Sequence, residues 1–168
     1  KVCISNWKRI SPQSFKPYAK GVGGYMNSTL AKIDAVNSGY DDAIMLGDND
    51  VVAEGSGQNL FLIKDGKITT PPIETGALGG ITRKTVIEIA QSLNIPLEEN
   101  NITIDDLKDA DELFFTGTAT EVVGVVSIDA ENIGSGVPGD ITNLIRDKYL
   151  TIVNGIDGDY HHYLTLVS

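Results

Sequence analysis

A lysine in a glycine-rich stretch is the first candidate for chemistry. Lys20 is followed by Gly21, Gly23 and Gly24, and then by Tyr25. Glycine carries no Cβ, so the backbone or a ligand can come close to such a segment. A lysine held in a closed site can lose its proton and become an amine nucleophile suited to Schiff-base chemistry. Taken alone, the stretch fits a solvated surface lysine better, because burial of an ammonium group is expensive.

A carboxylate at the end of an apolar segment is the second candidate. Glu54 follows Val51-Val52-Ala53 and precedes Gly55-Ser56-Gly57. A carboxylate that emerges from a buried strand must be paired or solvated, or its pKa rises. A cofactor cation would supply such a partner. A solvated glutamate in a turn explains the same residues slightly better when this cluster is considered alone.

Two further clusters can bind an anion. Residues 79–82, Gly-Gly-Ile-Thr, lead into a predicted helix, whose first free N–H groups and positive dipole end favour a phosphate. No Gly-Lys-Ser/Thr follows as in a Walker motif, and taken alone the cluster fits better a Thr82 that only caps the helix. Residues 117–120, Gly-Thr-Ala-Thr, join two apolar strands and can aim N–H groups and a hydroxyl at a phosphate or carboxylate. A polar turn that satisfies only itself is an equal interpretation.

The four clusters are more informative together than singly. They supply an amine nucleophile, a carboxylate and two anion sites. These are the parts needed to hold pyridoxal phosphate, in which an aldehyde meets a lysine, a pyridine nitrogen needs an acidic partner, and a phosphate needs donors.

The elements that must position these clusters form one mixed α/β domain. Apolar runs bounded by turn residues predict strands at residues 2–4, 43–46, 51–53, 60–64, 67–70, 113–116 and 122–126. Asp65-Gly66 is a two-residue hairpin signal. Helices are predicted from Asn27 or Ser28 to about residue 37, from residue 82 to about 93, after the cap at Thr103, and after a cap at Asp140.

Two of these helices have a predicted apolar face. In the first, we expect Leu30, Ile33 and Val36 to lie near one face, with Gly39 ending the helix. In the last, the expected face carries one polar residue, Lys148; its members are Ile141, Leu144, Ile145, Lys148 and Ile152.

Composition limits the classes of partner. A chain of 168 residues with a net charge of −10 is the size of one domain and lacks the basic character of a nucleic-acid or anionic-membrane partner. It has no apolar run of membrane-spanning length and no signal-peptide pattern. The single cysteine, Cys3, allows no internal disulfide, so we expect a cytoplasmic protein, and no metal site is expected. Because the chain starts at Lys1 and enters a strand at once, we expect it to be part of a longer protein.

Four ordered motifs resemble the large domain of the class IV (fold type IV) pyridoxal-phosphate aminotransferases, and among these the branched-chain amino-acid aminotransferases. The motifs are Lys20-x-x-x-x-Tyr25-x-Asn27-Ser28, Glu54-Gly55-Ser56-Gly57-Gln58-Asn59-Leu60-Phe61, Leu78-Gly79-Gly80-Ile81-Thr82-Arg83 and Gly117-Thr118-Ala119-Thr120-Glu121-Val122. The resemblance covers residues 1 to about 165. It implies a mixed sheet or barrel-like core with flanking helices, with residues 1–168 forming the C-terminal cofactor-binding domain and a small N-terminal domain absent.

The resemblance also assigns roles to residues. Lys20 resembles the Schiff-base lysine and proton shuttle, Tyr25 the tyrosine that bonds the cofactor's phenolic oxygen, and Glu54 the acid that pairs with the pyridine nitrogen. Leu78 is expected to pack on the cofactor ring. The expected phosphate contacts are Ile81, Thr82 and Thr118. The expected substrate contacts are Tyr25, Thr118 and Ala119.

The implied reaction is pyridoxal-phosphate-dependent transamination of branched-chain L-amino acids (Leu, Ile, Val) with 2-oxoglutarate, in branched-chain amino acid biosynthesis. The implied partners are amino acid and 2-oxo acid substrates and further copies of the chain, as a homodimer or larger homo-oligomer. Alternatives are another class IV enzyme, a D-amino-acid aminotransferase or an aminodeoxychorismate lyase, and a non-catalytic domain that keeps the fold. Gln58 departs from the family's usual glutamate, and the pair Gly23-Gly24 differs in register from the commoner form. Arg83 follows the phosphate motif, but we expect it to point elsewhere on its helix.

Overall fold

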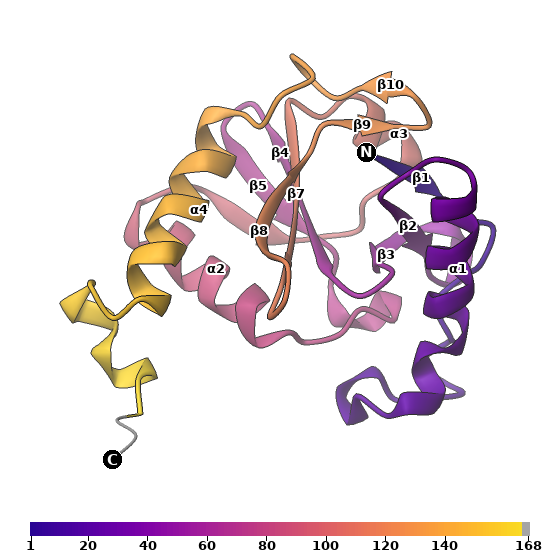
Figure 1. Ribbon diagram of the computed structural model, residues 1–168, viewed down its shortest axis with the longest axis horizontal. Helices are drawn as coiled ribbons and strands as arrows, with labels where there is room; N and C mark the ends of the chain where they lie inside the picture. Colours follow the sequence, from indigo (N-terminus) through magenta and orange to yellow (C-terminus); the bar gives the residue numbers. More distant parts are fainter. Residues whose placement is uncertain (166–168) are drawn as a thin grey trace.

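The computed structural model describes residues 1–165 and contains two five-stranded sheets with helices on their outer faces (Figure 1). The first sheet has the order β10-β9-β1-β2-β3, with β1 parallel to β2 and β9 and the other pairs antiparallel. Its strands are β1 (Val2–Ile4), β2 (Asp42–Leu46), β3 (Val52–Gly55), β9 (Ser127–Ile128) and β10 (Glu131–Asn132). The second sheet has the order β6-β5-β4-β7-β8, in which only the β5–β6 pair is parallel. Its strands are β4 (Asn59–Lys64), β5 (Lys67–Thr70), β6 (Leu97–Glu99), β7 (Glu112–Gly117) and β8 (Glu121–Val125).

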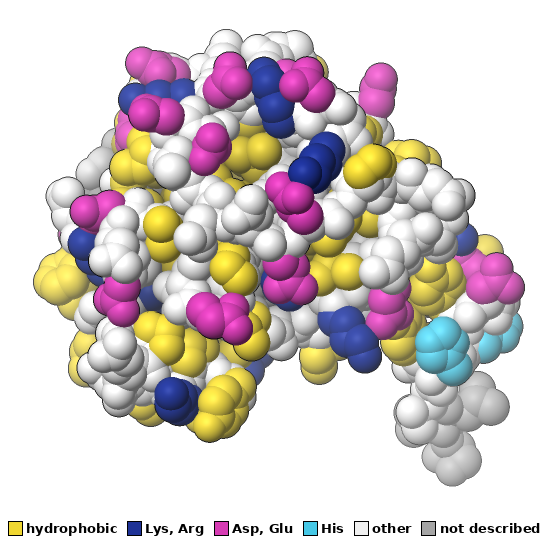
Figure 2. Space-filling model, turned by 180° about the vertical axis from the view of Figure 1, so that it is seen from behind, with side chains coloured by type: hydrophobic (Ala, Val, Ile, Leu, Met, Phe, Trp, Pro, Cys, Tyr) yellow, Lys and Arg dark blue, Asp and Glu magenta, His cyan; other side chains and the backbone are white. Residues whose placement is uncertain are grey.

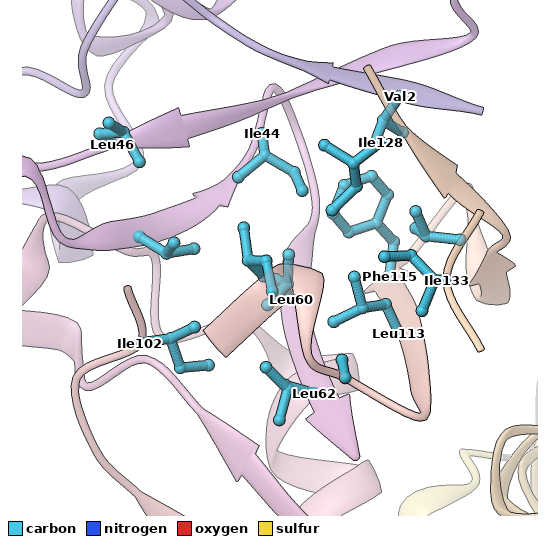
Figure 3. Close-up of a cluster of buried hydrophobic side chains, with 14 residues drawn as sticks. Val2, Ile44, Leu46, Leu60, Leu62, Ile102, Leu113, Phe115, Ile128 and Ile133 are labelled. Atoms are coloured by element: carbon cyan, nitrogen blue, oxygen red, sulfur yellow. The ribbon is translucent and has the colours of Figure 1, made fainter. Parts of the chain in front are cut away.

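The main core lies between the two sheets. Figure 3 shows side chains of both sheets pointing toward one another, among them Ile44 from β2 and Leu60 from β4. Successive residues of a strand point to opposite faces of the sheet. Leu60 and Leu62 therefore enter this core, while Phe61 and Ile63 face the other side of the second sheet.

A second core lies between that other side and two helices, α2 (Ile81–Ser92) and α4 (Asp140–Val153). Phe61 of β4 and Phe114 of β7 stack here with their ring centroids 4.9 Å apart. Val86, Ile89 and Ala90 of α2 are fully buried in the same cluster as these rings. This core therefore holds β4, β7 and α2 together, and three of the motifs begin or end on these elements.

The mixed α/β fold is confirmed, as are the predicted strands to within two residues at each end. Asp65 and Gly66 take φ of 49° and 75° at the β4–β5 turn, as a two-residue hairpin requires. Thr103 caps α3 (Ile104–Lys108) in a capping box with Asp106. Three other details of the helices differ from the predictions.

The start of α1 (Met26–Asn37) is the first difference, because neither Asn27 nor Ser28 caps it. A 3₁₀ turn, Val22–Tyr25, runs directly into the helix, so Tyr25 occupies the N-cap position. Asn27 instead donates to the backbone oxygen of Lys8, and the Ser28 hydroxyl is a partner of Arg9.

The face that α1 buries is the second difference. Ser28, Ala31 and Ala35 are buried on the side of α1 that packs against β2, whereas Ile33 and Val36 are 49% and 53% exposed. Small residues lie inward because α1 lies close against the first sheet. The larger apolar residues remain on the outside, and Figure 2 shows hydrophobic side chains at the surface on the side where α1 lies.

The start of α4 is the third difference. Its N-cap residue is Gly139, not Asp140. The carboxylate of Glu112, on β7, accepts hydrogen bonds from the N–H groups of Ile141 and Thr142 at 3.1 and 2.7 Å. A residue distant in sequence therefore caps this helix. The expected position of Leu144 on the buried face is also wrong, because its side chain is 48% exposed.

Within residues 1–165, no helix is both long and apolar enough to span a membrane. In the same part of the chain, no group of three or more histidine, cysteine, aspartate or glutamate side chains is arranged to hold a metal ion.

Candidate active site

The four motifs meet at one pocket, although they are separated by up to about a hundred residues in sequence. The pocket contains about 500 Å³ of empty space, part of which is open to solvent. Its lining consists of Lys20, Tyr25, Glu54, Gly57, Gln58, Asn59, Leu78, Gly80, Ile81, Thr82, Thr116, Gly117 and Thr118. Each contributing segment lies at the end of a strand or helix, where a rigid scaffold can present functional groups.

Lys20 enters the pocket from an irregular segment before α1. It follows a short 3₁₀ turn, Pro17–Ala19, and takes a left-handed backbone conformation with φ of 45° and ψ of 34°. Residues with a Cβ rarely adopt this conformation, and such strain is concentrated at functional sites. Lys20 is exposed, and the half-buried Tyr25 lines the pocket beside it. The lysine therefore lies at the open side of the pocket.

Glu54 forms part of the buried end of the pocket. Its side chain is 5% exposed, and both carboxylate oxygens have partners. Oε1 lies 2.9 Å from Nη2 of Arg9. Oε2 accepts from Nδ2 of Asn59 and from the backbone N–H of Leu78, both at 3.0 Å.

Burial dominates the acidity of Glu54. Removal of its carboxylate from water raises its pKa to about 7, against the opposing effects of the Arg9 charge and the Leu78 N–H group. Its protonation state is thus balanced near neutral pH, so a further positive charge brought into the pocket would favour the ionised form. The sequence-based alternative of a solvated turn glutamate is wrong.

The start of α2 forms a second wall. Gly80 is the N-cap residue and supplies no side-chain acceptor, so Thr82 does not cap the helix. Ile81 and Thr82 are the first two helical residues, and their N–H groups belong to the first turn, which has no intrahelical acceptors. Asn59 donates to the backbone oxygen of Leu78 at 2.7 Å, which fixes the entry to the helix. The arrangement provides N–H donors and a positive dipole end for an anion.

The end of β7 forms a further part of the lining. Thr118 lines the pocket from the turn between β7 and β8, whereas Ala119, exposed in the same turn, lies outside the lining. Thr116 also lines the pocket and is fully buried. Its hydroxyl has no hydrogen-bond partner among the described residues. A buried hydroxyl without a partner is uncommon and is consistent with a ligand as the missing partner.

The local environment of Gln58 accounts for its neutral side chain. Its Nε2 donates to Oδ2 of Asp42 at 2.9 Å, and the same carboxylate accepts from Ser56 and Lys32. Burial alone would raise the pKa of Asp42, but the hydrogen bonds from Lys32 and Ser56 lower it below its ordinary value. The amide of Gln58 therefore serves as a donor here, a role that a carboxylate could not fill.

Sequence reasoning located one arginine correctly and missed another. Arg83 is buried and points away from the pocket, where it binds Glu99 at 2.6 Å and the backbone oxygen of Pro71. Arg9, the partner of Glu54, lies between the predicted strand at residues 2–4 and the Lys20 stretch, and it belongs to no motif. Asn59 belongs to the Glu54 motif, but the motif predicts no role for it. Arg9 carries no local signal, because its contact with Glu54 depends on the pairing of distant strands.

Comparisons with known proteins agree on one family. The family model described as amino-transferase class IV matches residues 1–128. A probable branched-chain-amino-acid aminotransferase of Aquifex aeolicus is 44% identical over 165 residues, which are 98% of this chain and 53% of that protein. The branched-chain-amino-acid aminotransferase of Escherichia coli K12 is 36% identical, with the same coverage of each chain.

Solved structures give the same result. The branched-chain amino acid aminotransferase of Thermobaculum terrenum, in its PLP-form (holo-form), superposes with a TM-score of 0.94 at 39% identity over 98% of this chain and 54% of that one. The branched-chain aminotransferase of Thermoproteus uzoniensis with norvaline has a TM-score of 0.94 at 42% identity and covers 98% and 55%. The chain thus spans about half the length of the relatives it matches.

Proposed function

This chain belongs to the class IV aminotransferases, and we propose that it is the cofactor-holding part of a pyridoxal-phosphate-dependent branched-chain amino-acid aminotransferase. The observation that carries the proposal is the convergence of Lys20, Glu54 and the start of α2 on one pocket. The proposal extends to the whole protein. Relatives in this family are about twice as long as this chain.

The residues present fit the proposed cofactor. The buried Thr116 hydroxyl without a partner and the helix start at Gly80, which lacks a side-chain cap, both leave donors for a bound group. A side chain at Gly80 would leave no room there, because a Cβ would lie 2.2 Å from Oδ1 of Asn59. Glu54 supplies a buried acceptor suited to a ring nitrogen that carries a proton.

Each residue has a distinct role in the proposal. Bound pyridoxal phosphate supplies an aldehyde that joins amines and a ring that withdraws electrons. Lys20 provides the amine that attaches the cofactor and, when released, moves a proton to and from the substrate's α-carbon. Tyr25 would donate to the phenolic oxygen, Glu54 would pair with the ring nitrogen, and Leu78 would pack on the ring. A preorganised charged group such as the Glu54 carboxylate increases the rate of catalysis by on the order of 10²-fold or more.

The phosphate is assigned to the start of α2 and the β7–β8 turn. Ile81 and Thr82 provide backbone donors and a hydroxyl, and Thr118 lines the same pocket. The same turn, with Tyr25, is proposed to receive the substrate carboxylate. The position of Ala119 outside the lining limits its proposed contact to the rim of the site.

The proposed substrates are leucine, isoleucine and valine, with 2-oxoglutarate as the amino-group acceptor. The names of the relatives and the norvaline bound to the Thermoproteus uzoniensis structure support this class. We further propose that an N-terminal domain closes the open side of the pocket, and that the enzyme is a cytoplasmic homo-oligomer. The large apolar side chains exposed on α1 support an assembly in which that face is covered.

The test of the proposed function is covalent labelling of the complete protein. Borohydride reduction after loading with pyridoxal phosphate is expected to place a phosphopyridoxyl group on Lys20, as found by peptide mass mapping. The Lys20→Ala variant is expected to lose the label and transamination of leucine, isoleucine and valine. A label on Lys16 or Lys32 would contradict the assignment of the nucleophile. Transamination confined to D-amino acids would contradict the substrate class.

A further inference from the structure

Arg9 is a buried cation that the proposed roles do not yet use. It follows β1, and its side chain is only 10% exposed. Its guanidinium contacts three separate segments: Oε1 of Glu54 on β3, the hydroxyl of Ser28 on α1, and, at 3.4 Å, the backbone oxygen of Gly76 before α2. These three segments are the strand that carries the Glu54 carboxylate, the helix that follows Tyr25, and the chain that leads to the start of α2, where the phosphate is proposed to bind.

The hydrogen bonds of Glu54 leave one place for a ligand. An ionised carboxylate offers about four acceptor positions, two on each oxygen. Asn59 and the backbone of Leu78 occupy both positions of Oε2, and Arg9 occupies one of Oε1. A ring N–H group in the pocket therefore has the second position of Oε1, on the oxygen that Arg9 holds.

We propose that Arg9 is a positioning residue that shifts Glu54 toward its ionised form and turns Oε1 toward the cofactor's ring nitrogen. This inference rests on the proposed function for the identity of the ring. The effect of Arg9 on the ionisation of Glu54 does not depend on which ring binds, because both residues belong to this chain.

Other charges near Glu54 do not replace Arg9. Arg83, on α2, and Lys20, before α1, also favour the ionised carboxylate, but only through longer-range attraction. Arg83 is bound to Glu99, and Lys20 is exposed. The contacts from Asn59 and Leu78 are neutral. Arg9 is thus the only cation in direct contact with this carboxylate among the described residues, at a site where burial opposes ionisation.

A lysine at this position should not reproduce the role. The guanidinium presents donors in a rigid planar fork, so one group can bind Glu54, Ser28 and Gly76 in three directions. A lysine ammonium is a single point on a flexible stem. We therefore expect Arg9→Lys to retain part of the effect on charge and to lose part of the orientation.

The experiment combines infrared titration with a double-mutant cycle in the complete protein. The infrared spectrum of the cofactor-free protein is recorded as the pH is varied. The protonated-carboxyl band that is absent in Glu54→Gln is assigned to Glu54 and reports its protonation. Arg9→Gln is expected to move this titration up by about one to three pH units. It is expected to weaken pyridoxal phosphate binding about tenfold or more, since less Glu54 is ionised at neutral pH.

The cycle separates an action through Glu54 from a general loss of structure. In the Glu54→Gln background, the further change Arg9→Gln should alter cofactor affinity by less than about threefold, because the group through which it acts is gone. Ser28→Ala, which removes a neutral partner of Arg9, is the matched control and should leave the Glu54 titration unchanged.

Two results would overturn the inference. One is an unchanged Glu54 titration in Arg9→Gln, and the other is a loss of affinity of equal size with and without Glu54. If Arg9→Gln does not fold, Arg9→Lys is measured in the same way, and an unmoved titration together with wild-type affinity has the same meaning. The infrared arm needs no cofactor, so it remains decisive for Arg9 even if the proposed function fails.

Discussion

Replacement of Gly80 by alanine should damage the site far more than replacement of its neighbour Gly79. A Cβ at Gly80 would lie 2.2 Å from Oδ1 of Asn59, whereas one at Gly79 would lie 3.9 Å from Cγ2 of Ile73, an ordinary contact. Gly80 has φ of −67°, so the backbone tolerates alanine and the effect is purely steric.

The magnitude follows from the hydrogen bonds of Asn59. Carbon and oxygen do not approach closer than about 3.0 Å, so Asn59 or the start of α2 must move by about 0.8 Å. Such a shift stretches the bonds of Asn59 to Glu54 and Leu78 beyond hydrogen-bonding range. The loss of one charge-assisted and one neutral buried bond destabilises the fold by about 2 to 4 kcal/mol.

The assays are urea denaturation and pyridoxal phosphate titration of the complete protein. Gly80→Ala is expected to lower the free energy of unfolding by that amount and to weaken cofactor binding about tenfold to a hundredfold, because the phosphate donors lie directly after it. Gly79→Ala should be within about 0.5 kcal/mol of the parent. Equal effects of the two substitutions would refute the steric argument.

Three more predictions concern individual side chains. Thr116→Val should raise the free energy of unfolding without cofactor by about 1 to 3 kcal/mol, because it removes a buried hydroxyl that has no partner, yet weaken cofactor binding by about tenfold; unchanged binding in a titration would exclude contact with the ligand. Glu112→Ala should destabilise the protein by about 1 to 2 kcal/mol in urea by uncapping α4, and a larger loss in the Asp140→Ala control would contradict this. Because the folded state holds the Glu54 proton up to about pH 7, the free energy of unfolding without cofactor should fall by about 3 kcal/mol as the pH rises from 4.5 to 7. Glu54→Gln should remove this slope, and persistence of the slope would assign it to other groups.

Sequence patterns predicted local structure well where the determinants were local. The turn at Asp65-Gly66 depends on two residues that accept positive φ, and the capping box at Thr103 depends on a residue three positions later. The predicted cap of α4 at Asp140 was wrong, because Glu112 reaches the start of this helix from β7. The predicted buried face of α1 was wrong, because the close approach of the first sheet favours alanine over larger residues.

The candidate site divides in the same way. Lys20 and Glu54 were found because ordered motifs preserve both type and spacing, and they lie in one pocket. Arg9 and the bonds of Asn59 were not found, because they depend on which strands pair and how closely α2 approaches. The charge balance of Glu54 likewise depends on burial, which sequence spacing does not measure.

The assembly of the pocket from distant segments has a consequence for mutations elsewhere in the molecule. Lys20, Glu54, Thr82 and Thr118 come together only when both sheets and α2 are in place, so local opening of any one of them removes the complete binding surface. A ligand at this junction therefore stabilises the whole domain, by about 2.7 kcal/mol at a concentration about a hundred times its dissociation constant. Added pyridoxal phosphate should accordingly rescue folding-defective variants whose substitutions lie far from the pocket. An example is a variant in which Phe61 or Phe114 of the stacked pair is replaced by a smaller residue, which the ligand does not contact.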